Sequence, residues 1–513
     1  MNDHPAYLQR LRFLLWLAIA VSFFFNLSAV PLFDVDEGAF SEATREMFER
    51  GDFISPYLNG APRYDKPILI YWLQAASVAL FGFEPFAFRL PSALAATLWV
   101  LAVSAFVRKV RSAQLGYYAG IVTALCLAVS VIGKAATADA LLNLFIAVSM
   151  FALYLYYKER HSRYLLATFV AMGFGFLTKG PIAVLVPGVV SLIFFALRGE
   201  WRAWFKAVTH PGGILLFVAI ALPWYVLQYQ KEGQAFIEGF FFHHNVDRFQ
   251  GSLEQHGGSL FYYIPVVVLA ALPFSALLFN VALRWRDTMR DDLLLYCVLW
   301  FGFVFVFFSL SGTKLPHYMN YGLTGLIVLI TVVLPELKSR WLALIPALLL
   351  LLLLLALPLL LAYGAQYSGD VYMRDLLAAA PNYFGNGYRA VLLVFIAVTL
   401  YLMLTLRFTP VHKLFAAGLL SVFAISGLFL PALGEILQRP IQEAALLARK
   451  ENYTVVTWHV DAPSFSVYAQ RPTLRRAPQA GDVVLTKLKY LGELPNHDVL
   501  YSKNGLVLVK YRG

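Results

Sequence analysis

Long runs of apolar residues dominate this sequence. The stretch ALLLLLLLLALPLLLAY, residues 347–363, carries no charged side chain. About 20 such residues cross a bilayer as one helix, and lipid cannot satisfy the backbone polar groups of irregular segments. Strands of a membrane barrel would instead alternate apolar and polar residues. The 513-residue chain holds many such runs, so the sequence predicts an all-α protein that crosses the membrane many times.

The apolar runs predict about thirteen membrane-spanning helices. We place them at residues 11–30, 90–107, 115–133, 140–157, 164–178, 181–197, 212–228, 259–283, 293–309, 318–335, 341–363, 388–406 and 413–431. Alternate connections are rich in Lys and Arg, namely 107–111, 157–163, 198–206, 284–290, 336–340 and 407–413. Because basic loops stay in the cytoplasm, we expect the N-terminus inside and the C-terminus outside.

Two further helices are expected in the long first outer loop, residues 31–89. In the segment 37–50, apolar residues 39, 40, 43, 47 and 48 form one face and polar residues the other, as in a helix lying at the membrane surface. The segment 66–82 is apolar enough to span, but a span there would put the basic loops on the wrong side. We therefore expect it to lie at the outer surface as well.

The composition changes near residue 432. The stretches YTVVTWHV, DVVLTKL and GLVLVKYR are short strand-like runs separated by turns. The sequence thus predicts a membrane domain, residues 1–431, followed by a small α/β domain outside the membrane, residues 432–513.

Ionisable residues collect on the predicted outer side. They are Asp36 and Glu37 after the first span, Asp65 and Lys66 in the same loop, Lys134 and Asp139, Lys179, the FFHHNVDRF segment with His243 and Arg248, and Lys314 with Tyr318. Each has an ordinary explanation, since Asp caps helices and interfacial Lys reaches toward headgroups. Their shared side nevertheless favours one site that handles an anionic lipid.

Lysine and arginine beside carboxylates suit glycosyl transfer from a lipid phosphate. The cations would bind phosphate, and the carboxylates would stabilise an oxocarbenium-like centre. A transporter or flippase for an anionic lipid would also gather cations, but it would place ionisable residues near the middle of the membrane. A structural membrane subunit would leave the outer charges unexplained. The sequence therefore favours an enzyme working at one surface.

Several motifs resemble the GT-C glycosyltransferases, in the bacterial branch related to protein O-mannosyltransferases and lipid A aminoarabinose transferases. They are FDVDEGAFSEATREM, GDFISPYLNGAPRYDKPILIYWLQA, FRLPSALAA, TADALL, GFLTKGP, LPWY, HHNVDRF and TKLPHY. The resemblance implies an inverting transferase of the bacterial inner membrane. It would use an undecaprenyl-phosphate sugar donor at the periplasmic face and act on lipid A or another envelope acceptor.

The resemblance also implies roles for individual residues. Asp36 and Asp139 would be the catalytic carboxylates. The donor phosphate and its surroundings would be bound by Lys66, Arg248, Tyr318, Lys179, Lys314 and Glu37. Asp65 and His243 match a pair that can hold a divalent metal, Zn²⁺, Mg²⁺ or Mn²⁺.

The sugar and the acceptor stay open at this point. Ala39 and Phe40 stand where the family often has a basic residue and Tyr, and Asp65 stands where Glu is common. With an ionised phosphate acceptor, Asp36 would only orient the sugar or stabilise charge, whereas with a hydroxyl acceptor it would be the general base.

Overall fold

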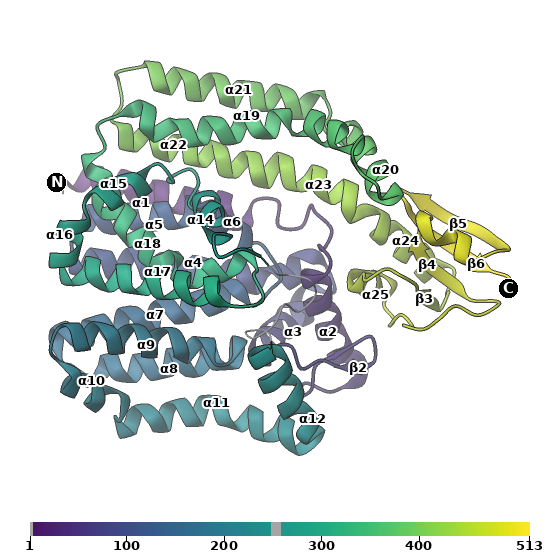
Figure 1. Ribbon diagram of the computed structural model, residues 1–513, viewed down its shortest axis with the longest axis horizontal. Helices are drawn as coiled ribbons and strands as arrows, with labels where there is room; N and C mark the ends of the chain where they lie inside the picture. The colour runs from purple at the N-terminus through teal and green to yellow at the C-terminus, as the bar shows by residue number, and fades with distance from the viewer. Residues whose placement is uncertain (1–3, 248–257) are drawn as a thin grey trace.

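The protein is described by a computed structural model covering residues 4–247 and 258–513 (Figure 1). A bundle of long helices forms most of the molecule, and a small domain with a β-sheet lies at one end. The described part of the chain begins at the end of the bundle far from that domain. Within the described residues, nine helices are long and apolar enough to cross a membrane. The prediction of a polytopic all-α protein is confirmed.

The bundle and its connections comprise the following elements: α1 (Pro5–Ile19), η1 (Ala20–Phe24), α4 (Pro85–Val110), α5 (Ala113–Leu125), α6 (Leu127–Ile132), α7 (Asp139–Glu159), α8 (Ser162–Lys179), α9 (Ile182–Leu197), α10 (Trp201–Val208), α11 (Pro211–Glu232), α12 (Gln234–Ile237), η2 (Glu238–Asp247), α14 (Tyr263–Ala270), α15 (Leu277–Leu283), α16 (Trp285–Arg290), α17 (Asp292–Leu310), η4 (Pro316–Met319), α18 (Asn320–Val333), η5 (Leu334–Glu336), α19 (Arg340–Ala365), α20 (Val371–Ala379), η6 (Ala380–Tyr383), α21 (Asn386–Leu404), α22 (Pro410–Phe423), η7 (Ala424–Phe429) and α23 (Leu430–Leu437).

Two of the predicted spans are broken rather than continuous. The span predicted at 115–133 divides at Cys126 into α5 and α6, and the span predicted at 259–283 divides around Pro273 into α14 and α15. Polar groups at the two breaks bond to each other. The Leu127 N–H donates to Leu272 O at 2.9 Å, and Cys126 Sγ contacts Ala270 O at 2.9 Å. Hydropathy could not predict these breaks, since each depends on a distant partner.

The first outer loop holds α2 (Asp36–Arg50), the short strands β1 (Tyr57–Leu58) and β2 (Ala61–Pro62), and α3 (Leu69–Phe81). Both expected helices are present, and α2 ends at Gly51, whose φ of 64° suits a glycine. Most of the polar face of α2 over residues 37–50 is buried, however, and only Glu49 and Arg50 at its end are exposed. Glu42 and Arg45 are buried and form a bidentate pair at 2.7 and 2.8 Å. Burial, only partly offset by Arg45, raises the pKa of Glu42 to about 8.

A small domain covers α2. It contains α24 (Arg439–Lys450), β3 (Val455–Thr457), α25 (Pro463–Ala469), β4 (Val483–Lys487), η8 (Leu488–Glu493), β5 (His497–Lys503) and β6 (Leu506–Tyr511). The sheet order is β3-β4-β6-β5, with β3 and β4 parallel and the other pairs antiparallel. One apolar core joins Phe465 and Tyr468 of α25 to Leu32, Phe88 and Ala136 of the membrane domain. The small domain is therefore packed into the first outer loop.

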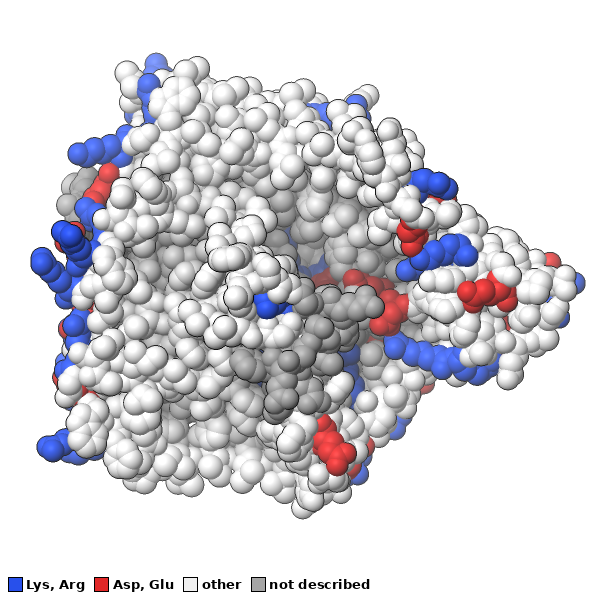
Figure 2. Space-filling model, in the orientation of Figure 1, with Lys and Arg blue, Asp and Glu red and all other residues white. Residues whose placement is uncertain are grey.

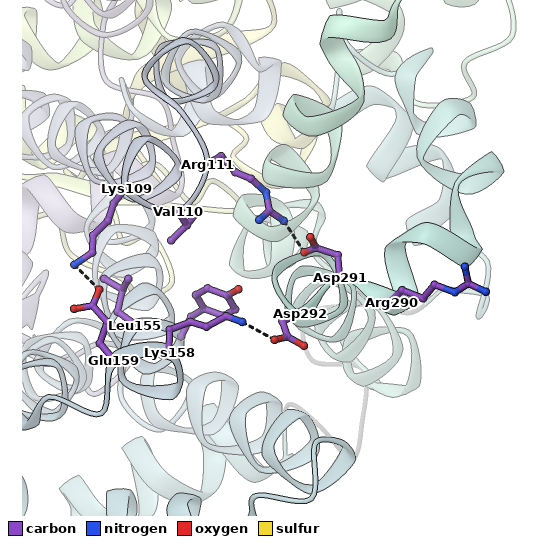
Figure 3. Close-up of a pocket in the computed structure, with 10 residues that line it drawn as sticks. Lys109, Val110, Arg111, Leu155, Lys158, Glu159, Arg290, Asp291 and Asp292 are labelled. Carbon is purple, nitrogen blue, oxygen red and sulfur yellow. Dashed lines mark hydrogen bonds and ion pairs between the residues drawn. The ribbon is translucent and has the colours of Figure 1, made fainter. Parts of the chain in front are cut away.

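Lys and Arg side chains line the opposite end of the molecule, at the left edge of Figure 2, where Figure 1 places α10 and α16. A cavity of about 480 Å³ lies among the basic loops there (Figure 3). Its charges pair with one another: Lys109 with Glu159 at 2.7 Å, Arg111 with Asp291 at 2.5 Å and Lys158 with Asp292 at 2.6 Å. The predicted basic loops thus gather at one end and are tied together by ion pairs.

Close packing of α4 against α5 gives a stability prediction. A Cβ on Gly116 would lie 2.5 Å from Arg108 Cβ and 2.7 Å from Ser104 O. We expect Gly116→Ala to lower the free energy of unfolding by about 1–3 kcal/mol, since overpacking forces the helices apart. Gly188→Ala in α9 is the control, because its Cβ would meet nothing within 4 Å. Thermal unfolding in detergent measures both variants, and an equal Tm for the two would contradict the prediction.

Candidate active site

A buried ion pair shapes the loop before α2. Arg89 of α4 donates to both carboxylate oxygens of Glu37, at 2.8 and 2.7 Å. The same guanidinium donates to the carbonyls of Leu27, Val30 and Pro31. Glu37 also accepts from the backbone N–H groups of Phe33, at 2.8 Å, and Ala136, at 2.7 Å. Glu37, predicted to bind substrate, is thus occupied by the protein and holds the loop in place.

Asp36 begins α2 and faces a charged cluster. Asp139, at the start of α7, accepts from Lys179 at 2.7 Å and from Tyr321 at 3.4 Å. Although Asp36 as a residue is exposed, desolvation of its carboxyl and the nearby Asp139 raise its pKa, while Lys179 and Lys66 lower it. The two carboxylates and two lysines predicted from separate turns therefore meet at one place.

Lys66 belongs to a second group of charges in the first loop. Its Nζ contacts Asp65 Oδ1 at 2.5 Å, and Arg63 contacts Asp65 Oδ2 at 3.1 Å. Arg63 also donates to the buried Tyr71 hydroxyl at 3.1 Å. Both oxygens of Asp65 thus bind cations of the protein.

That arrangement does not suit the expected metal site. Asp65 is neutralised by two side-chain cations, and His243 is exposed on η2. Across residues 4–247 and 258–513, no group of three or more His, Cys, Asp or Glu side chains is placed to hold a metal ion. We derive no step through a metal.

The last three predicted residues are Tyr318, Lys314 and Arg248. Tyr318 packs on Phe308, with ring centroids 4.6 Å apart, and neighbours Tyr321. Lys314 donates to Ser311 O at 2.7 Å. Arg248 lies outside the described residues.

Comparison with known proteins gives the family. Residues 65–226 match the family described as dolichyl-phosphate-mannose-protein mannosyltransferase. The chain is 31% identical over 315 residues to the undecaprenyl phosphate-alpha-4-amino-4-deoxy-L-arabinose arabinosyl transferase of Serratia proteamaculans, covering 59% of this chain and 56% of that protein. It is 30% identical over 340 residues to an uncharacterized protein of Aquifex aeolicus, covering 66% of this chain and 77% of that protein. The chain belongs to the GT-C glycosyltransferases.

A solved structure shares the fold of this chain. ArnT from Cupriavidus metallidurans, bound to undecaprenyl phosphate, superposes with a TM-score of 0.82 at 21% identity and covers 97% of both chains. The alignment with the Serratia enzyme, by contrast, spans little more than half of that relative's length. The fold is therefore shared over almost the whole chain.

Three residues of the site were not predicted from the sequence. Tyr321 bonds Asp139, His317 lies close enough to interact with the charge of Asp139, and Arg63 binds Asp65. His317 lies within the motif TKLPHY and Arg63 within PRYDKP, so their neighbours pointed to them. Tyr321 follows three residues after Tyr318, one helical turn along, and this spacing was the available signal.

The small domain reaches the loop that carries Asp36. Asp34 accepts from the Ser464 N–H at 2.9 Å and from the Ser464 hydroxyl, and the Leu32 N–H donates to the Tyr468 hydroxyl at 2.8 Å. Gly38 permits this approach, because a Cβ there would lie 2.5 Å from Ser464 N. Burial raises the pKa of Asp34 to about 7, although both Ser464 bonds lower it. The small domain therefore helps to position Asp36.

Ser464→Ala tests this positioning. Losing a hydrogen bond to a buried carboxyl removes about 1.5–3 kcal/mol, and a misplaced loop slows transfer. We expect sugar-transfer turnover to fall roughly tenfold with a smaller change in donor KM. Thr486→Val is the matched control: Thr486 is fully buried in the same domain, and its hydroxyl has no partner among the described residues. Equal turnover in the two variants would contradict the assigned role.

Proposed function

We propose that this protein is an inverting transferase that moves a sugar from an undecaprenyl-phosphate donor to an envelope acceptor. The preferred reaction is transfer of aminoarabinose to a lipid A phosphate. It would take place at the periplasmic face of the bacterial inner membrane, with the N-terminus in the cytoplasm and the C-terminus in the periplasm. Residues 1–431 would carry the site, and residues 432–513 would cover it.

The observation that carries this proposal is the meeting of Asp36 with the Asp139–Lys179 and Asp65–Lys66 pairs. Residues from three other places in the chain, Asp65 with Lys66, Asp139 and Lys179, act on the Asp36 carboxylate at the ends of helices, where a lipid headgroup would lie. The name of the Serratia relative and the ligand of the Cupriavidus structure supply the donor chemistry. Charges at helix ends also fit an enzyme better than a transporter, whose ionisable groups lie near the membrane centre.

The reaction follows from these charges. An acceptor oxygen attacks the anomeric carbon from the face opposite the donor phosphate, and the bond from that carbon to the phosphate oxygen breaks. The bonding electrons leave on the lipid phosphate, whose charge Lys66 neutralises. Asp36 stabilises the oxocarbenium-like centre, and Lys179 and Tyr321 hold Asp139 beside it.

The acceptor decides whether a base is required. An ionised phosphate oxygen attacks without losing a proton, so Asp36 would then act through its charge. A hydroxyl of another glycolipid, glycan or protein must lose a proton, and Asp36 would accept it. Its raised pKa makes it a better base than an ordinary aspartate.

Asp36→Asn removes the charge while keeping the shape. We expect at least about a thousandfold loss of turnover, since electrostatic stabilisation of a transition state is commonly worth that much. Donor binding and Tm should change little. Asp498→Asn in β5, where Asp498 pairs with Arg512, is the control. Retained activity in Asp36→Asn would show that another group performs this role.

Mass spectrometry of the envelope tests the substrate. Cells producing the protein should carry lipid A with an added aminoarabinose on a phosphate, and cells with the Asp36→Asn form should not. A sugar found instead on another glycolipid, glycan or protein would favour the hydroxyl-acceptor alternative. An unchanged envelope in both cells would refute the proposed function.

A further inference from the structure

A cavity of about 320 Å³ opens beside Asp36. Its walls come from the segment after η1, the turn between α6 and α7, and the η7–α23 helix. Polar groups on its wall include Asp34, Asp36, Lys134 and Thr137. An apolar side is formed by Val131, Leu430 and Leu433. The volume suits a phosphate with part of a sugar, next to an apolar group.

Lys134 supplies a buried positive charge in this cavity. Its side chain is 8% exposed, and its Nζ donates to Phe25 O at 2.5 Å. An ammonium group can donate three hydrogen bonds. Within the described residues, the Lys134 ammonium donates one, to Phe25 O. Burial, with a further contribution from Arg89, lowers the pKa of Lys134 to about 7. A buried cation with one neutral acceptor is costly, and a bound anion would offset that cost.

Arg89, the other cation on the cavity wall, already has partners in the protein. Arg89 is engaged by Glu37 and by three backbone carbonyls. Asp34 and Asp36 on the same wall would repel an anion. Lys134 is therefore the group on this wall that can bind one.

The cavity and the charged cluster share Asp36. The cluster containing Lys66, Lys179 and Asp139 influences Asp36, yet none of these three residues lines the cavity. Asp36 itself belongs to both. Thr137 lines the cavity and contacts Asp139 at 3.4 Å. An inverting transfer needs the acceptor and the leaving phosphate on opposite faces of the anomeric carbon, and two adjoining sites that share a carboxylate can hold the two substrates.

We propose that this cavity is the acceptor site and that Lys134 binds the phosphate of an anionic glycolipid. The inference rests on the proposed function and adds the place and the chemistry of the second substrate. The acceptor phosphate lies against the Lys134 ammonium, and its lipid-facing part lies along Val131, Leu430 and Leu433. The donor phosphate occupies the Lys66 side.

Lys134→Met in the full-length protein tests the contact. The probe is an acylated, phosphorylated glucosamine disaccharide, with an undecaprenyl-phosphate sugar as donor. We expect the acceptor KM to rise at least about tenfold, the usual result of losing a charge-assisted hydrogen bond, and the donor KM to stay within about twofold. Lys413→Met is the matched control, since Lys413 is also buried and also donates to a backbone carbonyl, that of Thr405.

Two further measurements keep the result interpretable. Ala135→Leu fills the cavity without removing a charge and should also raise the acceptor KM, so the test stands even if Lys134→Met folds poorly. Equilibrium binding of the dephosphorylated probe should be equal in wild type and Lys134→Met. An equal loss of affinity for the phosphorylated and dephosphorylated probes would overturn the phosphate contact.

The outcomes separate the two proposals. Wild-type protein that transfers sugar, with an unchanged acceptor KM in both Lys134→Met and Ala135→Leu, refutes the acceptor site alone. Wild-type protein that transfers no sugar to the phosphorylated probe refutes both the acceptor site and the preferred transfer to a lipid A phosphate.

Discussion

The ion pair between Arg89 and Glu37 fixes the frame on which the site is built. One guanidinium joins α4 to the start of α2 and to three carbonyls of the preceding loop, and Glu37 extends the network to Ala136 in the α6–α7 turn. Breaking such a buried pair costs about 3–5 kcal/mol, because the remaining charge stays unpaired. Asp36 stands next to Glu37, so its position follows from this network.

The network around Arg89 and Glu37 supports both the cavity side and the cluster side of the site. The α6–α7 turn carries Lys134 on the cavity side and leads into Asp139 on the cluster side. A shift of that turn would move both together. In the proposed reaction, the binding of two substrates and their alignment at Asp36 would thus depend on one junction, as transfer between two bound molecules requires.

The sequence predicted the features that depend on local pattern. Apolar runs gave the helices, and the basic loops grouped Asp36, Lys66, Asp139 and Lys179 on one side. It missed features that depend on partners far along the chain. Arg89 pairs with Glu37 across 52 residues, Leu127 meets Leu272, and Ser464 reaches Asp34 across 430. For the same reason the polar face of α2 was expected to be exposed, although the small domain covers it.

The small domain that covers α2 also affects the side from which lipid substrates would arrive. With α25 packed on α2, the Asp34 side of the site is shielded from water, while the cavity wall at Val131, Leu430 and Leu433 is apolar. Excluding water at Asp34 strengthens the charge interactions there. Lipid substrates can reach an apolar wall from the membrane without crossing the aqueous side. In the proposed function, the small domain would thus favour substrates that arrive from the membrane.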